Sequence, residues 1–193
     1  MNRLSEPDAL EKDRQLWQAL KNGDAQALEA LFRSHVVFLR DYGVRLCGRE
    51  ELVEDGIQEV FLQLWEKRQS LSEINSARVY LLVALKNRLL NALARKKRAQ
   101  AAHEQYGILL DDESFSLEEI FIAREEEAAK KRALEAALKQ ISPRQREAFY
   151  LKTREELSYN EIAETMNISP QVARNYVSEV YEKLRELLPA FKP

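Results

Sequence analysis

The sequence contains one cysteine, Cys47, among its 193 residues. A single thiol excludes an internal disulfide framework and a cysteine-based zinc cluster, because both need several cysteines. Cys47 follows Leu46 near the predicted end of a helix, so we expect a small, buried or half-buried packing residue. Long apolar runs are also missing, and the N-terminus "MNRLSEPDALEKD" has no apolar signal core. We therefore expect a soluble, cytoplasmic protein.

Glycine and strand patterns are scarce as well. The chain has five glycines and 32% charged residues, and the apolar spacing is helical nearly everywhere. This composition predicts an all-α fold whose helices are joined by short turns. His35 lies on an apolar stripe and His103 follows a basic segment, which predicts a core and a surface histidine. Because no nucleophile–base pair, metal cluster or glycine-rich phosphate loop is present, we expect no enzyme, no metal and no cofactor.

Helical patterns fill the N-terminal half of the chain. The first clear pattern follows "NGD", where Asp24 is a suitable N-cap residue. A second helix is expected over about 50–68 and a third over about 76–98. The apolar stripe predicted for the first pattern consists of Leu28, Leu31, Phe32, Leu39, Tyr42 and Leu46, with His35 among them.

The net charge of -2 conceals an abrupt change along the chain. Residues 78–100 contain seven basic and no acidic residues, whereas residues 104–127 contain nine acidic residues and one basic residue. The acidic stretch includes "YGILLDDESFSLEE", whose composition indicates a linker. We therefore predict a helical domain over 15–98, an acidic linker over 99–127 and a second helical domain over 128–193, which begins with a helix over 128–140.

The second domain carries two sequence signatures of helix starts. Ser142 with Gln145, and Ser158 with Glu161, each match a capping box. After the second of these helices, "NIS" forms a turn, and Ser169 precedes Pro170 at the start of a last helix. Two short helices across a tight turn predict a helix-turn-helix.

The last helix has two distinct faces. Its predicted buried stripe consists of Ala173, Val177, Val180 and Leu184, and its opposite face presents Gln171, Arg174, Asn175 and Ser178. Arginine can pair with a guanine edge, and glutamine or asparagine with adenine. The alternative is an ordinary helical hairpin with a solvated face. Residues 141–188 contain seven basic and eight acidic residues, so this module should bind DNA only weakly by itself.

The helix over 50–68, "EELVEDGIQEVFLQLWEKR", also separates into two faces. Its predicted inner face consists of Val53, Ile57, Val60, Phe61, Leu64 and Trp65, and its outer face of Asp55, Gln58, Glu59, Leu62 and Glu66. Such a polar face is usually only solvated. Leu62 among acceptor side chains also suits a docking surface for a basic partner.

The helix over 76–98 ends in a basic band. Its predicted inner side consists of Val79, Leu82, Val83, Leu89, Leu90 and Leu93, with Lys86 as an exception that could snorkel. Its outer band consists of Tyr80, Ala84, Asn87, Arg88, Asn91, Arg95 and Arg98. An aromatic ring, amides and arginines along one face could bind single-stranded nucleic acid. The alternative is a basic helix end favoured by the helix dipole.

Three stretches in this order resemble the extracytoplasmic-function group of bacterial RNA polymerase sigma factors. They are "VEDGIQEVFLQLWEKR", "VYLLVALKNRLLNALARKKR" and "LKQISPRQREAFYLKTREELSYNEIAETMNIS", and the resemblance extends from about Ala19 to Leu188. It implies a factor that binds core RNA polymerase and directs promoter recognition. Gly56 departs from the family's usual leucine, which should loosen its helix by about 1 kcal/mol relative to alanine. Tyr80 replaces the family's common tryptophan.

The resemblance also assigns roles to the faces. Asp55, Gln58, Glu59 and Leu62 would dock on the clamp helices of the largest polymerase subunit, and the flap region would be a further contact. The minus-ten element would be captured by Ser72, Asn75, Tyr80, Asn87, Arg88, Asn91, Arg95 and Arg98. The minus-thirty-five element would be read by Gln171, Arg174, Asn175 and Ser178. The family further implies a membrane-linked anti-sigma factor that covers the polymerase-binding faces.

A conventional transcription regulator is the main alternative. Its helix-turn-helix would bind operator DNA as a dimer, and its N-terminal part would be a receiver or ligand domain. A receiver requires alternating strands and helices around an acidic phosphorylation pocket, and the sequence shows neither pattern.

Overall fold

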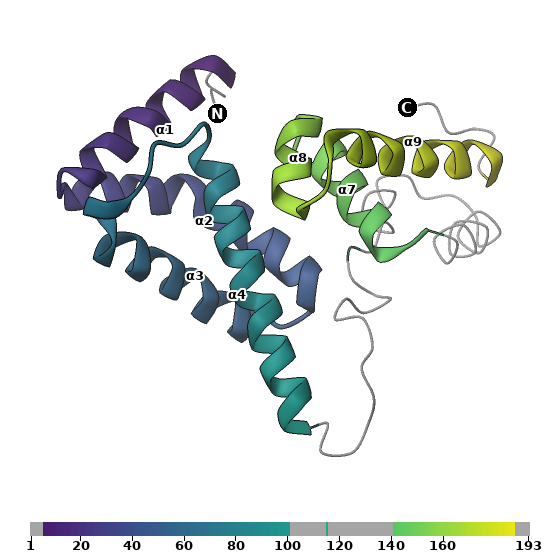
Figure 1. The fold of residues 1–193 in the computed structure, drawn as a ribbon, viewed down its shortest axis with the longest axis horizontal. Helices are drawn as coiled ribbons and strands as arrows, with labels where there is room; N and C mark the ends of the chain where they lie inside the picture. The colour runs from purple at the N-terminus through teal and green to yellow at the C-terminus, as the bar shows by residue number, and fades with distance from the viewer. Residues whose placement is uncertain (1–5, 101–114, 116–140, 188–193) are drawn as a thin grey trace. The chain divides into compact units, whose positions relative to one another are not determined.

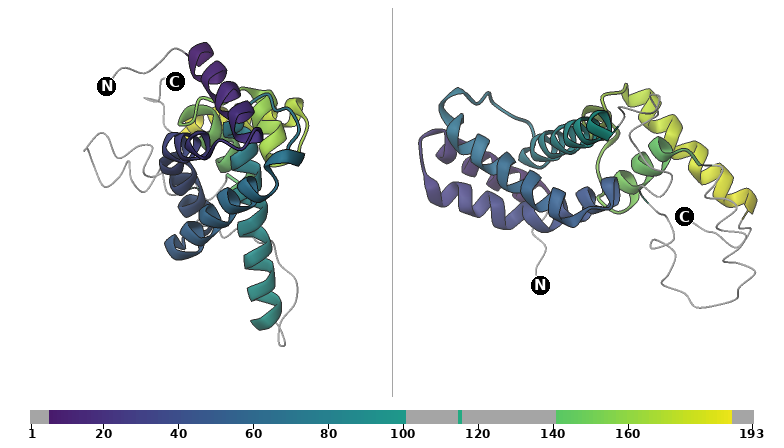
Figure 2. Two further views of the ribbon diagram at one scale, coloured as in Figure 1. Left: turned by 90° about the vertical axis from the view of Figure 1, so that its left-hand side faces the viewer. Right: turned by 90° about the horizontal axis from the view of Figure 1, so that it is seen from below.

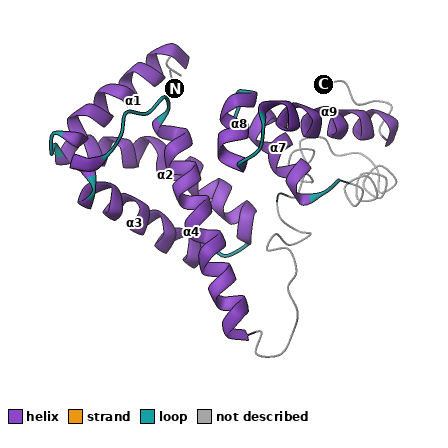
Figure 3. Cartoon of the chain, in the orientation of Figure 1, coloured by secondary structure: helices purple, strands orange, loops and turns teal. Residues whose placement is uncertain are grey.

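The computed structural model describes residues 6–100, Phe115 and residues 141–187. Within these residues the regular elements are helices, as Figure 3 shows, in agreement with the predicted all-α fold. The chain divides into two compact units, Met1–Leu109 and Leu110–Pro193. The predicted helix over 128–140, His103 and, apart from residues 99, 100 and 115, the predicted linker fall outside the described residues.

The helices of the first unit, shown in Figure 1, pack against one another and bury a shared set of apolar side chains. The C-terminal part of α4 extends beyond α1, α2 and α3 in Figure 1 and in the left view of Figure 2. The elements are α1 (Glu6–Lys21), α2 (Ala25–Cys47), α3 (Glu50–Glu66), the short 3-10 helix η1 (Arg68–Ser70) and α4 (Ala77–Gln100).

The ends of α2 follow the sequence signals. The Asp24 carboxylate accepts from the backbone N–H groups of Gln26 and Ala27 at 2.8 and 3.4 Å, which confirms the predicted N-cap. At the other end Gly48 adopts a left-handed φ of 63°, and its N–H donates to the Val44 carbonyl at 2.7 Å. Glycine takes this conformation without a steric penalty, so α2 stops there and the chain turns into α3.

The α2 and α3 stripes are buried largely as predicted. Phe32 is an exception, since it is 37% exposed and packs edge-to-face on Phe61 with ring centroids 5.1 Å apart. Trp65 is half-buried, beneath the guanidinium of Arg68. His35 is a core residue, with Nε2 3.0 Å from the carboxylate of Asp13 but without a well-directed hydrogen bond.

The inner face predicted for α4 was partly wrong. Leu81 and Leu85, which lay outside that prediction, are fully buried, whereas Val83, Leu90 and Leu93 are only half-buried. The reason is that α4 contacts α1, α2 and α3. Three neighbours bury a wider sector than the single stripe expected of a surface helix.

The sequence patterns did not predict α1. Among the described side chains of α1, Trp17 and Leu20 are buried. Two buried apolar residues among so many charged ones give too weak a periodic signal to predict a helix. Both side chains lie in the last turn and a half of α1, and the helix contacts α2, α4 and η1.

Two glycines allow the helices to approach closely. A Cβ at Gly43 of α2 would lie 2.6 Å from Val53 Cγ1, and one at Gly56 of α3 would lie 3.1 Å from Leu85 Cδ1. Gly56 therefore has a packing role against α4, beyond the loss of helix propensity expected from the sequence.

The described part of the second unit contains α7 (Pro143–Thr153), α8 (Tyr159–Met166) and α9 (Pro170–Leu187). Both predicted capping boxes are present, at Ser142 and at Ser158. Phe115, from the predicted linker, is buried with its ring 5.4 Å from that of Tyr150. At least this residue packs on α7 instead of lying in solvent.

Two further sequence expectations concern Cys47 and membranes. Cys47 is half-buried, as predicted, and burial raises the pKa of its thiol while the Arg49 backbone partly opposes that change. No helix among the described residues has the length and apolar character needed to cross a bilayer.

Candidate nucleic-acid and polymerase interfaces

The outer face of α3 is set by the packing of its inner face. Val53, Ile57 and Leu64 are buried, which fixes the rotation of the helix about its axis. All four predicted docking residues are consequently exposed: Asp55, Gln58, Glu59 and Leu62. Leu62 is 58% exposed, so an apolar side chain lies in water between acceptor groups. This arrangement suits a partner with both basic and apolar groups.

A groove of about 630 Å³ lies along the junction of α3 and α4. Five of the predicted minus-ten residues line it, namely Tyr80, Asn87, Arg88, Asn91 and Arg95. Gln63 of α3 and Lys67, which follows the end of α3, line the opposite wall and were not predicted from the sequence. Nothing in the α3 pattern distinguishes these two residues from solvated ones, because only the packing against α4 brings them to the groove. Arg98 belongs to α4, but its side chain lies outside the described residues.

An ion pair connects the α3 face to this groove. Arg88 Nη1 contacts the Glu59 carboxylate, and the Arg88 side chain is 22% exposed against 56% for Glu59. The predicted polymerase-binding and DNA-binding residues are therefore in direct contact here. Sequence spacing could not show this, since the two residues belong to different helices.

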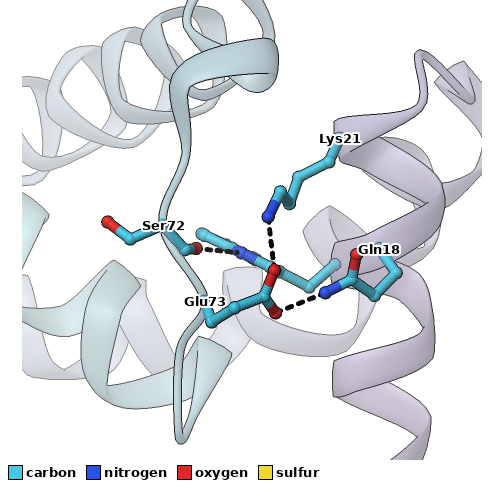
Figure 4. Close-up of polar contacts among 5 residues, drawn as sticks. Gln18, Lys21, Ser72 and Glu73 are labelled. Atoms are coloured by element: carbon cyan, nitrogen blue, oxygen red, sulfur yellow. Dashed lines mark hydrogen bonds and ion pairs between the residues drawn. The ribbon is translucent and has the colours of Figure 1, made fainter.

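The loop between η1 and α4 is held against α1 (Figure 4). The Trp17 indole N–H donates to the Ser72 carbonyl at 3.1 Å. Glu73 accepts from Lys21 Nζ at 2.5 Å and from the Gln18 amide. The hydrogen bond from Lys21, together with its charge and the Gln18 bond, lowers the pKa of the Glu73 carboxyl.

A smaller hollow of about 350 Å³ lies between α1 and this loop. Of the two loop residues predicted to capture the minus-ten element, Asn75 lines this hollow and Ser72 does not. The Ser72 carbonyl instead accepts the hydrogen bond from Trp17. The other lining residues are Arg14, Trp17 and Gln18 of α1, and Glu73 and Ile74 of the loop. The α1 residues were missed because α1 itself gave no clear sequence signal.

The second unit presents the predicted reading face on α9. Gln171, Arg174, Asn175 and Ser178 are exposed, whereas Ala173, Val177, Val180 and Leu184 are buried. The turn before α9 depends on Asn167, whose left-handed φ of 52° ends α8. The Ser169 hydroxyl then accepts from the Val172 N–H at 3.2 Å, which confirms the predicted cap.

The α9 side chains are already ordered by local contacts. The Gln171 amide donates to Asn175 Oδ1 at 2.9 Å, and Arg174 lies over the Tyr159 ring at 4.9 Å. Both contacts hold polar groups near the start of α9, which is the part of a recognition helix that enters the major groove. Among the described residues, no group of three or more His, Cys, Asp or Glu side chains could hold a metal ion.

Comparison with known protein families gives two matches. Residues 31–99 match the model for Sigma-70 region 2, and residues 131–184 match the model for Sigma-70, region 4. Together the two matches cover more than half of the chain. They include the α3 face, the groove and the helix-turn-helix, but not α1.

Similar proteins support the same assignment. The chain is 28% identical over 171 residues to the RNA polymerase sigma factor CarQ of Myxococcus xanthus, covering 89% of this chain and 94% of CarQ. It is 25% identical over 154 residues to the ferric citrate uptake sigma factor FecI of Escherichia coli (strain K12), covering 80% of this chain and 86% of FecI.

Two solved structures share the fold. CnrH, in complex with the cytosolic domain of CnrY, aligns with a TM-score of 0.60 at 19% identity, over 94% of this chain and 99% of that one. The sigma factor RpoE of Bartonella quintana, in complex with the anti-sigma factor NepR, aligns with a TM-score of 0.55 at 21% identity. That alignment covers 86% of this chain and 97% of RpoE.

Proposed function

Because the chain belongs to the extracytoplasmic-function group of RNA polymerase sigma factors, we propose that three of its surfaces divide the work of promoter recognition. A sigma factor directs core RNA polymerase to promoters, and the chemistry of RNA synthesis remains with the polymerase. The alternative of a conventional dimeric regulator is therefore wrong. The residues that perform each step are our proposal.

The α3 face docks on the clamp helices of the largest polymerase subunit. The exposed Leu62 between Asp55, Gln58 and Glu59 carries this assignment, because an apolar side chain 58% exposed among acceptors fits a partner with basic and apolar groups. The second unit adds a contact with the flap region.

The groove between α3 and α4 holds the melted minus-ten strand. Tyr80 offers an aromatic surface for base stacking, while Arg88, Arg95 and Lys67 offer charge for phosphates. The loop bearing Ser72 and Asn75 captures a base that has left the stack, which costs a few kcal/mol of unstacking. The smaller hollow beside Asn75 has room for part of such a base.

The α9 face reads the minus-thirty-five element in the major groove. With a net charge of -2 over the whole chain, the free protein should bind duplex DNA weakly. Polymerase supplies the nonspecific attraction and holds both units on one promoter, which raises the effective concentration of each reader.

An anti-sigma factor restrains the protein. The two fold relatives were solved in complex with CnrY and with the anti-sigma factor NepR, and the exposed α3 face of this chain is available to such a partner. We expect the restraining protein to compete with core polymerase for that face.

Co-purification with core polymerase tests the docking proposal. The double variant Asp55→Arg/Gln58→Ala should lose core binding while its helical content is unchanged, because it reverses one charge on the face and shortens a second side chain. Glu29→Arg, an exposed charge reversal on α2, is the matched control and should bind normally. Normal core binding by the double variant would remove the α3 assignment, although the family assignment would stand.

A further inference from the structure

The α1 helix supplies a set of contacts that no assigned role explains. It precedes residues 31–99, which match Sigma-70 region 2, yet three of its side chains are directed at the loop between η1 and α4 (Figure 4). Lys21 follows Gln18 by three residues and Trp17 by four, so the three side chains lie on one side of α1. That face covers Ser72 and Glu73.

Glu73 is the centre of these contacts. One carboxylate oxygen accepts from Lys21 Nζ and the other from the Gln18 amide. We call these two hydrogen bonds, from Lys21 and Gln18 to Glu73, the tie. Lys21 is 21% exposed and Glu73 is 71% exposed, so the tie joins a largely buried lysine of α1 to an exposed side chain of the loop. The buried Trp17 also donates its indole N–H to the backbone carbonyl of Ser72, the residue before Glu73.

The hollow beside Asn75 depends on this tie. Three of its six lining residues come from α1 and three from the loop. If the loop moved away from α1, the two walls would separate and the hollow would lose its shape. A loop whose backbone is not held samples many conformations, and each residue that must be ordered on binding carries an entropic cost.

We propose that Glu73 is a positioning residue, which α1 holds through Lys21 and Gln18 so that the loop is preformed for the unstacked minus-ten base. The inference rests on the proposed function. It assigns α1 the task of setting base discrimination at the minus-ten element, without placing Lys21 in contact with DNA. Lys21 does not line the hollow, so its substitution acts on base binding only through Glu73.

The test uses holoenzyme reconstituted from core polymerase and the full chain. Its probe is the promoter that the wild-type holoenzyme selects most strongly from a genomic fragment library, together with single-base substitutions across the minus-ten element. The readout is the ratio of open complexes on the selected and substituted promoters. Core affinity and the thermal unfolding midpoint are measured in parallel.

Lys21→Met should lower the discrimination ratio by roughly tenfold, the effect of leaving about one backbone residue to be ordered on binding. Core affinity should not change, and the unfolding midpoint should fall only slightly, because Glu73 is 71% exposed and an exposed ion pair contributes little to stability. Lys21→Arg keeps a donor and a charge, so it should retain discrimination. Lys12→Met removes another exposed lysine of α1 and should behave as wild type.

The ratio also separates positioning from a direct phosphate contact. A phosphate contact made by Lys21 carries no base preference, so its loss would weaken binding to the selected and substituted promoters alike and leave the ratio unchanged. An unchanged ratio in Lys21→Met would therefore overturn the inference. A wild-type holoenzyme that shows no preference at the minus-ten element would instead remove the proposed function and this inference together, and that result is visible without any variant.

Discussion

Trp17 and Tyr80 meet edge-to-face, with ring centroids 4.9 Å apart and an interplanar angle of 67°. Trp17 lines the smaller hollow and Tyr80 lines the groove between α3 and α4, so this pair separates the two spaces in which we place single-stranded DNA. Tyr80 was predicted as an exposed stacking residue, and it is 37% exposed. Its ring is supported from behind by a buried tryptophan, which fixes the face that it offers to a base.

Substitutions of Tyr80 should therefore show whether a base binds through the aromatic ring, which packs on Trp17, or through the hydroxyl group. Tyr80→Ala should weaken binding of a minus-ten single strand to the holoenzyme by about 1–3 kcal/mol, the usual contribution of one base on an aromatic ring. Tyr80→Phe should retain most of that binding, because the ring and its contact with Trp17 remain. Fluorescence of a 2-aminopurine base placed in the minus-ten strand would measure the effect. Equal loss in both variants would show that the hydroxyl, and not the ring, makes the contact.

Weakening the ion pair between Glu59 and Arg88 should change the binding of single-stranded DNA and of core polymerase in opposite directions. Glu59→Gln weakens the pairing of Arg88 by removing the negative charge beside it, so binding of the free protein to a single-stranded oligonucleotide should become tighter. Binding to core polymerase should become weaker, because Glu59 belongs to the proposed docking face. Arg88→Ala should weaken oligonucleotide binding and reduce the slope of log affinity against log salt by about 1.

A double-mutant cycle with Glu59→Gln and Arg88→Ala gives the control for stability. Glu59 is 56% exposed, so the coupling energy in urea unfolding should be only about 0.2–1 kcal/mol. A coupling well above that range would show that the pair is chiefly structural, and the DNA effects could then reflect partial unfolding.

The contribution of sequence reasoning differs between local and tertiary features. Capping residues such as Ser142 and Ser158, and the exposed face of α9, follow from interactions within a few residues, so they were predicted correctly. Leu85 and Lys67 could not be assigned, because their surroundings are determined by other helices. Because the apolar periodicity of α1 is weak, the helix was not predicted. The contact between Lys21 and Glu73 therefore could not be predicted either.

The two helical glycines differ in the space around them and should respond differently to alanine. At Gly43 the added methyl would lie 2.6 Å from Val53 Cγ1, and the valine is stiff at χ1. Overpacking of about 1–3 kcal/mol should exceed the gain in helix propensity of about 1 kcal/mol, so Gly43→Ala should be destabilising. Urea unfolding measures this difference.

At Gly56 the nearest atom, Leu85 Cδ1 at 3.1 Å, is the end of a flexible side chain. Gly56→Ala should therefore change the unfolding free energy by less than about 0.5 kcal/mol, since propensity and crowding nearly cancel. A Gly43→Ala protein as stable as Gly56→Ala would show that α2 and α3 can separate at no cost, contrary to the packing described.

The tie between Glu73 and Lys21 should depend on pH. The hydrogen bond from Lys21 lowers the pKa of Glu73, so the charged carboxylate is favoured in the folded protein. The stabilisation of the folded protein by the Glu73 carboxylate is fully present above the usual carboxyl pKa range. It is lost as the pH falls through the lowered pKa of Glu73. A carbon-detected NMR titration of the Glu73 carboxyl should give a pKa below the usual range, and Lys21→Met should return it toward that range. The same pKa in wild type and Lys21→Met would contradict the contact.

Arg174 offers the most direct test of groove reading by α9. Its guanidinium lies over the Tyr159 ring, a position that limits its motion while leaving the planar fork exposed at the start of the helix. A bidentate contact from this fork to a base contributes about 1–3 kcal/mol of discrimination. Arg174→Ala should therefore reduce transcription from promoters that carry the minus-thirty-five element by roughly 5- to 150-fold, as that energy range implies.

The Arg174 prediction is specific to one promoter element, and this supplies its control. Templates that lack the minus-thirty-five element should be transcribed equally by wild type and Arg174→Ala, because no base contact remains to be lost. Arg174→Lys keeps the charge but not the fork, so it should resemble alanine if bases are read and wild type if only phosphate is bound. Arg154→Ala, an exposed arginine of the same unit beyond the end of α7, should have little effect on either template. Equal losses on both templates for Arg174→Ala would place Arg174 at the phosphate backbone and move sequence reading to Gln171 and Asn175, whose amides are already paired with each other.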